Sequence, residues 1–180
     1  MKNNKILFKI TLSATFISLG MILPYFTGQI PEIGSMLCPM HIPVLLCGFI
    51  CGWKYGLLVG LILPIFRSLI IGMPPLFPTA LCMSFELAGY GLISGVMYKL
   101  LPKKKIYIYL SLIIAMIVGR MIWGLVMFSA LGFNTIKFTP MIFIMNGFVN
   151  AIPGIILQIV LIPLIVMIYN RLNIKNSNTD

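Results

Sequence analysis

Long apolar stretches alternate along the chain with short segments that are basic or rich in Gly and Pro. A run of roughly 20 apolar residues spans the hydrocarbon core of a bilayer as an α-helix. Breaks fall at Pro24, at 72–78 and at Pro102, where proline and glycine end helices. We therefore predict an all-α integral membrane protein, a six-transmembrane-helix bundle in a single domain over residues 1–180. The helices are expected at about 5–23, 40–52, 55–71, 79–101, 106–131 and 141–169, followed by a frayed polar tail at 170–180.

The composition agrees with a multi-pass protein of the cell membrane. Hydrophobic residues make up 60% of the chain and charged residues 9%, and the mean hydropathy is +1.07, which is too apolar for a soluble domain. The first segment lacks a small-residue cleavage site after Leu23, so we expect a membrane helix there and not a signal peptide. The cysteines lack any CxxC spacing, which predicts buried thiols and neither a metal site nor disulfides; they are Cys38, Cys47, Cys51 and Cys82.

The basic residues predict the orientation of the bundle. The net charge of +10 would suit a nucleic-acid partner, but the charges cluster at segment ends, as positive-inside sorting places them, and we expect no nucleic-acid binding. With six crossings, one side carries only Lys137. The other side, predicted to be cytoplasmic together with both termini, carries Lys2, Lys5, Lys9, Lys54, Lys99, Lys103, Lys104, Lys105, Arg171 and Lys175. A rival count of five crossings merges the segments 40–52 and 55–71 into a re-entrant hairpin and would separate the termini.

Glu86 is the only acidic residue inside an apolar segment. A carboxylate at membrane depth costs about 2.5 kcal/mol or more unless it faces a partner or a polar cavity, so it marks a candidate functional site. By helix rise Glu86 lies roughly 10 Å, and Arg120 roughly 16 Å, from the predicted outer ends of their helices. The other candidate residues for an outward-facing ligand pocket are Met83, Tyr90, Trp123, Asn146, Asn150 and His41.

Each candidate also has a purely structural interpretation. Glu86 and Arg120 could pair with each other as an ion bridge. Asn146 and Asn150, four residues apart on one helix face, could be interhelical hydrogen-bond glue. His41 could cap or pack at a helix start. We expect Arg67, near the outer end of its helix, to snorkel to lipid headgroups.

A face of small side chains runs along the first predicted helix. Thr11, Ala14, Thr15 and Ser18 recur at helical spacing. Such a face lets another membrane helix approach closely. Packing within the same bundle is the simpler explanation, and docking of a partner helix is the functional one.

Several motifs resemble the substrate-binding S component of an energy-coupling factor (ECF) vitamin transporter. They are the Gly/Pro/Cys-rich stretch 34–56, the segment Pro64-Ile-Phe-Arg-Ser68 and the segment Gly72-Met-Pro-Pro-Leu-Phe-Pro78. The resemblance implies a six-helix protein that captures a vitamin-like solute from outside. It also implies association with a membrane scaffold subunit and two cytoplasmic ATPases, and toppling in the membrane to release the solute. The family's Ala-x-x-x-Ala docking motif would correspond to Ala14 and Ser18, with serine replacing the second alanine. The family's ligand would lie under the loop between the first two helices and against the last three.

The sequence lacks the residues that a membrane enzyme or a channel would need. With one histidine and no intramembrane aspartate, the chain carries no Ser/His pair, HExxH motif or metal-binding aspartates, so we predict no enzyme, no metal and no cofactor. A channel would need a charge ring that Glu86 alone does not supply without oligomerisation. ATP hydrolysis would belong to partner subunits.

We predict a neutral heteroaromatic, nucleoside-like solute, with pantothenate as the alternative. The two asparagines match an adenine edge, and Trp123 or Tyr90 could stack on the base. A free Glu86 carboxylate accepts from hydroxyl or amine groups and repels an anion such as pantothenate. That argument fails if Arg120 neutralises Glu86, or if Arg120 or Arg67 binds the anion.

Overall fold

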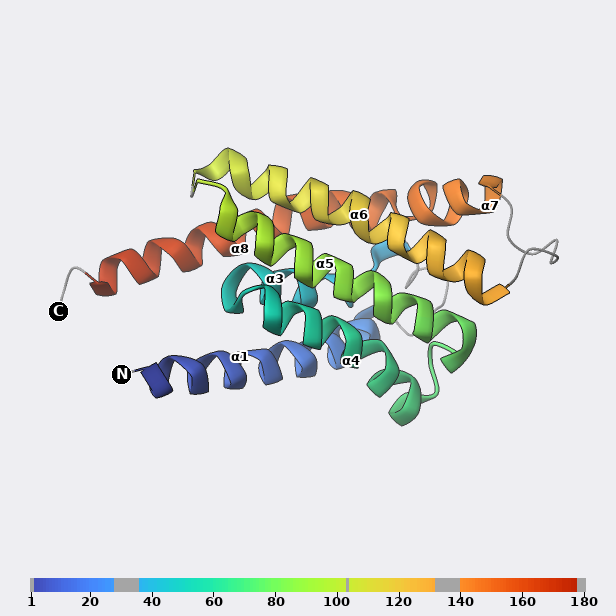
Figure 1. The fold of residues 1–180 in the computed structure, drawn as a ribbon, viewed down its shortest axis with the longest axis horizontal. Coiled ribbons are helices and arrows are strands. Elements are labelled where there is room, and N and C mark those ends of the chain that lie inside the picture. The colour runs from blue at the N-terminus through green and yellow to red at the C-terminus, as the bar shows by residue number, and fades with distance from the viewer. Residues whose placement is uncertain (1, 28–35, 103, 132–139, 178–180) are drawn as a thin grey trace.

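The computed structural model describes residues 2–27, 36–102, 104–131 and 140–177, and in these ranges the chain is helical. Both chain ends lie at the same end of an elongated bundle (Figure 1). The elements are α1 (Lys2–Ile22), the 3₁₀ turn η1 (Leu23–Thr27), α3 (His41–Cys51), α4 (Trp53–Ile71), the irregular turn η2 (Leu76–Ala80), α5 (Leu81–Leu100), α6 (Lys105–Leu131), α7 (Pro140–Ile144), the π-helical turn η3 (Met145–Val149) and α8 (Ile152–Ser177).

Among the described residues, five segments are long and apolar enough to cross a membrane. They are Asn4–Phe26, Trp53–Ile71, Leu76–Leu100, Lys105–Ala130 and Ile152–Leu172. The structure thus fits the α-helical membrane protein that hydropathy predicts. The segment expected as the second crossing is different, because α3 has 11 residues, or roughly 16 Å, about half of the hydrocarbon thickness.

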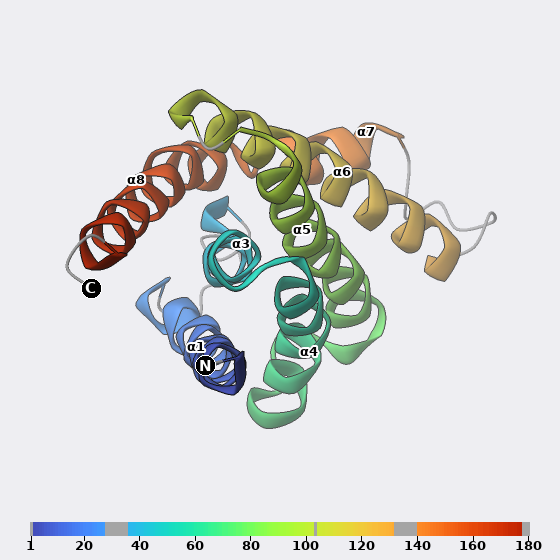
Figure 2. The ribbon, with the colours of Figure 1, turned by 60° about the vertical axis from the view of Figure 1, so that its left-hand side comes forward.

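The short helix α3 forms the centre of the bundle. Figure 2 shows it lying between α1, α4, α5 and α8, and it packs against all four. Its side chains from His41 to Phe49 are buried, so they face protein on every side. Only Gly52, with a φ of 101°, separates α3 from α4. That left-handed conformation favours glycine and allows the abrupt reversal.

The closest helix crossing joins α4 to α5. A Cβ atom added at Gly91 would lie 2.2 Å from the carbonyl oxygen of Gly56, so the two backbones touch. Small residues are what allow membrane helices this approach. The crossing fixes the rotation of α5 and therefore the direction of Glu86.

The predicted last helix at 141–169 is not continuous. It consists of α7, the π-helical turn η3, a turn at Asn150 and Ala151, and then α8. Pro153 explains the break, because it has no amide hydrogen and its ring would clash with the carbonyl of Val149 in an unbroken helix. The polar tail expected from Asn170 also differs: α8 continues to Ser177, and Asn170 Nδ2 donates to Tyr98 Oη at 2.6 Å.

Candidate functional site

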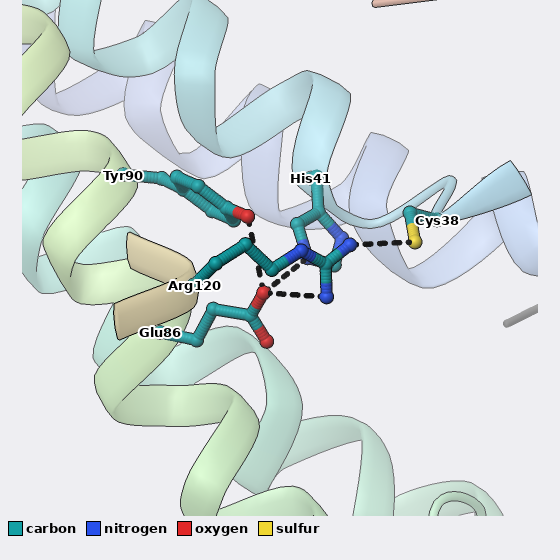
Figure 3. A network of polar contacts seen from close by, with 5 residues as sticks. All are labelled: Cys38, His41, Glu86, Tyr90 and Arg120. Atoms are coloured by element: carbon teal, nitrogen blue, oxygen red, sulfur yellow. Dashed lines mark hydrogen bonds and ion pairs between the residues drawn. The ribbon is translucent and has the colours of Figure 1, made fainter. Parts of the chain in front are cut away.

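One oxygen of Glu86 collects three polar contacts at the centre of the bundle (Figure 3). Arg120 Nη1 lies 2.9 Å from Glu86 Oε1, and Tyr90 Oη donates to the same oxygen at 3.1 Å. His41 Nε2 lies 3.4 Å from it. The ion pair that the sequence left as one alternative is therefore the arrangement in the structure.

Four parts of the chain position this network. Glu86 and Tyr90 are one turn apart on α5, Arg120 comes from α6, and His41 is the first residue of α3. Cys38, in the loop before α3, accepts a hydrogen bond from Arg120 Nη2 with an N–S distance of 3.5 Å. Nothing in the sequence pattern marked the contact between Cys38 and Arg120.

Burial makes the charge balance of the network important. Relative exposures are 1% for Glu86 and Tyr90, 3% for His41 and 9% for Arg120. Burial raises the pKa of the Cys38 thiol, so this group stays neutral and does not cancel the charge of Arg120. Glu86 and Arg120 thus neutralise each other, as buried charges must.

One buried polar atom of the network lacks a partner. His41 Nδ1 has no hydrogen-bond partner in the part of the chain that the structure describes. Buried polar atoms in native proteins are nearly always hydrogen-bonded, so such an atom indicates a place for water or a ligand.

Aromatic side chains at the site have two different roles. Trp123, one turn from Arg120 on α6, stacks on Phe143 of α7 with ring centres 6.0 Å apart and planes inclined by 20°. The Tyr90 ring is enclosed, because it packs at 5.1 Å on the His41 ring and a Cβ at Gly119 would touch it. In this arrangement the Tyr90 ring contacts protein, and stacking of either Tyr90 or Trp123 on a ligand stays a prediction.

The remaining predicted pocket residues are less tightly grouped. Met83 is half-buried on α5 and Asn150 is exposed in the turn before α8. Asn146 lies in η3, and its side chain lies outside the described residues. Neither asparagine lies beyond the break at Asn150 and Ala151, so their position on one helical face stays a prediction. The segments 28–35 and 132–139, within the loops after the first and fifth predicted helices, also lie outside the described residues.

Arg67 does not reach the lipid headgroups. It is 4% exposed, and its Nη1 donates to the carbonyl oxygen of Met21 at 2.8 Å. Its guanidinium also lies 5.6 Å from the centre of the Tyr25 ring. The snorkelling prediction is wrong because the last turn of α1 leaves carbonyl groups without helical donors, and Arg67 satisfies one of them.

The small-residue face of α1 is not used inside the described part of the bundle. Thr11, Ala14, Thr15 and Ser18 are all exposed. The hydroxyl groups donate to carbonyls of their own helix, at 3.1 Å in each case. No described helix packs on this face, so in the described part of the chain it stays available to a partner helix.

Comparison with known families decides the class of this protein. The sequence profile of the family described as ECF transporter, substrate-specific component, matches residues 8–166. The chain belongs to this family. Comparison with curated proteins and with solved structures finds no match. As an S component, the chain is a substrate-binding membrane subunit of a transporter and not an enzyme.

Proposed function

We propose that this S component captures a small vitamin-like solute from outside the cell at the Glu86 network. The unpartnered His41 Nδ1 carries this assignment, since it is a buried polar atom next to a buried ion pair. Polar groups from three helices converge there at membrane depth, which is the usual construction of a solute site in a helical membrane protein.

The topology that we propose has six crossings with both termini in the cytoplasm. The start of α1 and the end of α8 lie at one end of the bundle (Figure 1), so the chain must return between α1 and α4, and we infer that α3 is part of that return. The excess of lysine and arginine at this end favours the cytoplasm. Glu86 then lies near the outer end of α5.

We also propose the partners that this family implies. The S component would deliver its solute by joining a membrane scaffold subunit and two ATPases, which would hydrolyse the ATP. The exposed face of Ala14 and Ser18 on α1 supports a helix–helix contact with the scaffold.

For the solute we propose a flat heteroaromatic, nucleoside-like compound. The stacked pair of Trp123 and Phe143 offers a ring surface one turn from Arg120. Aromatic side chains stack on any nucleobase, because every base has a flat π-face. His41 Nδ1 adds a polar group that can pair with a ring nitrogen, an amine or a hydroxyl.

Pantothenate is the second candidate, and the ion pair favours it. Because Arg120 neutralises Glu86 at 2.9 Å, the site does not repel an anion as a free carboxylate would. A carboxylate ligand could exchange with Glu86 on the guanidinium, whose planar donors suit carboxylates.

Replacing Glu86 with glutamine should separate these two solutes. Nucleoside binding should weaken by about 1–3 kcal/mol, because a charge-assisted hydrogen bond is lost. Pantothenate binding should hold or improve, because Arg120 loses its internal counter-charge. Isothermal titration of the purified protein with adenosine and with pantothenate measures both. Tyr90→Phe is the matched control, since it removes a contact to the same oxygen without a change of charge. Tight pantothenate binding with no adenosine binding by the wild type would rule out the nucleoside proposal.

Replacing Trp123 with leucine should weaken a nucleoside-like ligand by about 1–3 kcal/mol through the loss of base stacking. Pantothenate has no aromatic ring and should bind nearly as before. The control is Phe85→Leu. Phe85 precedes Glu86 in sequence, but its ring is exposed on the surface of the bundle. Equal losses for both ligands in Trp123→Leu would mean that Trp123 supports the fold and does not stack on the solute.

A further inference from the structure

A second polar site lies at the end of the bundle that carries both termini. A cavity of about 800 Å³ opens there, where the first half of α1, the α3–α4 junction and the last turns of α5 and α8 meet. Glu86 is 13 residues from Lys99 along α5, or roughly 20 Å away. The cavity is therefore separate from the proposed solute site.

Three lysines from three helices line this cavity: Lys9 of α1, Lys54 of α4 and Lys99 of α5. Glu86 is the one acidic residue among the described residues, and it is paired with Arg120. No carboxylate of the described residues therefore neutralises the three ammonium groups. Lys9 Nζ lies 6.0 Å from the centre of the Tyr55 ring, and Lys54 Nζ lies 5.4 Å from that of Trp53. Aromatic faces attract these cations but leave the net positive charge of the cavity in place.

The cavity wall is ordered and has the composition of a membrane interface. Trp53, Tyr55 and Tyr98 line it, and tryptophan and tyrosine gather at the level of the lipid headgroups. Asn170 donates to Tyr98 Oη at 2.6 Å, and the Tyr98 ring packs edge-on against Phe49 at 5.3 Å. These contacts hold the wall in place between the lysines.

Topological sorting alone explains lysines at this end, but not their convergence. Lys104 and Lys105 satisfy the positive-inside pattern as exposed residues at the start of α6. Lys9, Lys54 and Lys99 are exposed as well, but they line one concave, aromatic surface and come from three different helices. A concave surface lined by charges of one sign concentrates ions of the opposite sign, so this cavity attracts anions.

We propose that this cavity binds the phosphate headgroup of an anionic phospholipid. A lipid fits better than free phosphate, because the cavity opens between membrane-spanning helices and its aromatic wall can cover the glycerol region while the lysines reach the phosphate. Basic pockets of this kind between membrane helices are suited to acidic headgroups. The bound lipid joins α1 to α4 and α5, so it stabilises the packing of α1 on the bundle.

The test titrates phosphatidylglycerol, phosphatidylcholine or inorganic phosphate into the full-length protein in detergent. Retained lipids are counted by native mass spectrometry, and thermal unfolding reports stabilisation. Phosphatidylglycerol should bind and stabilise the protein, and Lys54→Gln with Lys99→Gln should weaken its binding about 30-fold, since each lysine near anionic lipid contributes about fivefold. The matched control, Lys104→Gln with Lys105→Gln, removes the same charge from the same end outside the cavity and should change binding little.

Each other result overturns the proposal. Equal effects of phosphatidylcholine, or equal losses in the control pair, would mean that no headgroup site exists in the cavity. Full stabilisation by inorganic phosphate alone would assign the cavity to a soluble anion. Normal lipid binding by the cavity variant, together with lost assembly with the scaffold and ATPases, would assign it to a protein partner.

Discussion

Replacing Arg120 with methionine should destabilise the protein by about 3–5 kcal/mol, because it leaves the Glu86 carboxylate buried without its counter-charge. Methionine fills a similar volume and leaves no large cavity. The loss of stability is therefore due to the unpaired charge and not to poorer packing. Glu86 is 1% exposed and lies 2.9 Å from Arg120. Without Arg120, water therefore cannot solvate the buried carboxylate. Unfolding in detergent, followed by circular dichroism, measures the change. The same variant should lose high-affinity solute capture, since the network would rearrange around the unpaired carboxylate.

A double variant separates the ion pair from unspecific damage. Combining Arg120→Met with Glu86→Gln removes both charges and should recover most of the lost stability, while solute capture stays impaired. The difference between the double variant and the sum of the two single variants gives the coupling of the pair. Arg171→Ala, at an exposed arginine of α8, controls for the loss of an arginine and should have almost no effect. Additive losses in the double variant would contradict the pairing of Glu86 with Arg120.

The parts of the fold that hydropathy encodes were predictable from the sequence. Helices of about 20 apolar residues and their proline or glycine ends follow from local composition, and the membrane class followed with them. The break before α8 was also visible in principle, since Pro153 cannot continue an ordinary helix without losing a hydrogen bond. The burial of the short helix α3 among four other helices depends on neighbours that a linear pattern does not contain.

The site was predictable only in part. Glu86 stood out because it is the single carboxylate in an apolar segment, and Arg120 was its natural partner. The contact of Cys38 with Arg120 and the stacking of Trp123 on Phe143 join residues 82 and 20 positions apart, and helical spacing says nothing about such pairs. Arg67 was misplaced for the same reason. Its depth in the membrane predicted that the Arg67 side chain reaches the lipid headgroups. In the structure its guanidinium donates instead to a backbone carbonyl at the end of α1.

Replacing Ala14 and Ser18 together with leucine should abolish solute uptake while solute binding by the isolated S component stays unchanged. Both residues are exposed on α1, and the Ser18 hydroxyl is already bonded to the carbonyl of Ala14 at 3.1 Å, so their contribution to a partner is close packing and not a polar contact. Two bulky side chains at a small-residue helix crossing should weaken assembly with the scaffold at least about 30-fold, at 1–3 kcal/mol for each overpacked position.

Uptake into cells that express the whole transporter, compared with titration of the purified S component, measures both effects. The matched control is Ser129→Leu on α6, where an exposed hydroxyl is also bonded to its own helix at 2.9 Å. That variant adds the same bulk to a helix surface outside the proposed docking face, so it should transport normally. Normal uptake by the α1 double variant would refute the docking assignment. Loss of solute binding in that variant would show that the α1 face supports the solute site itself. The proposal that solute binding and scaffold docking use separate surfaces would then be wrong.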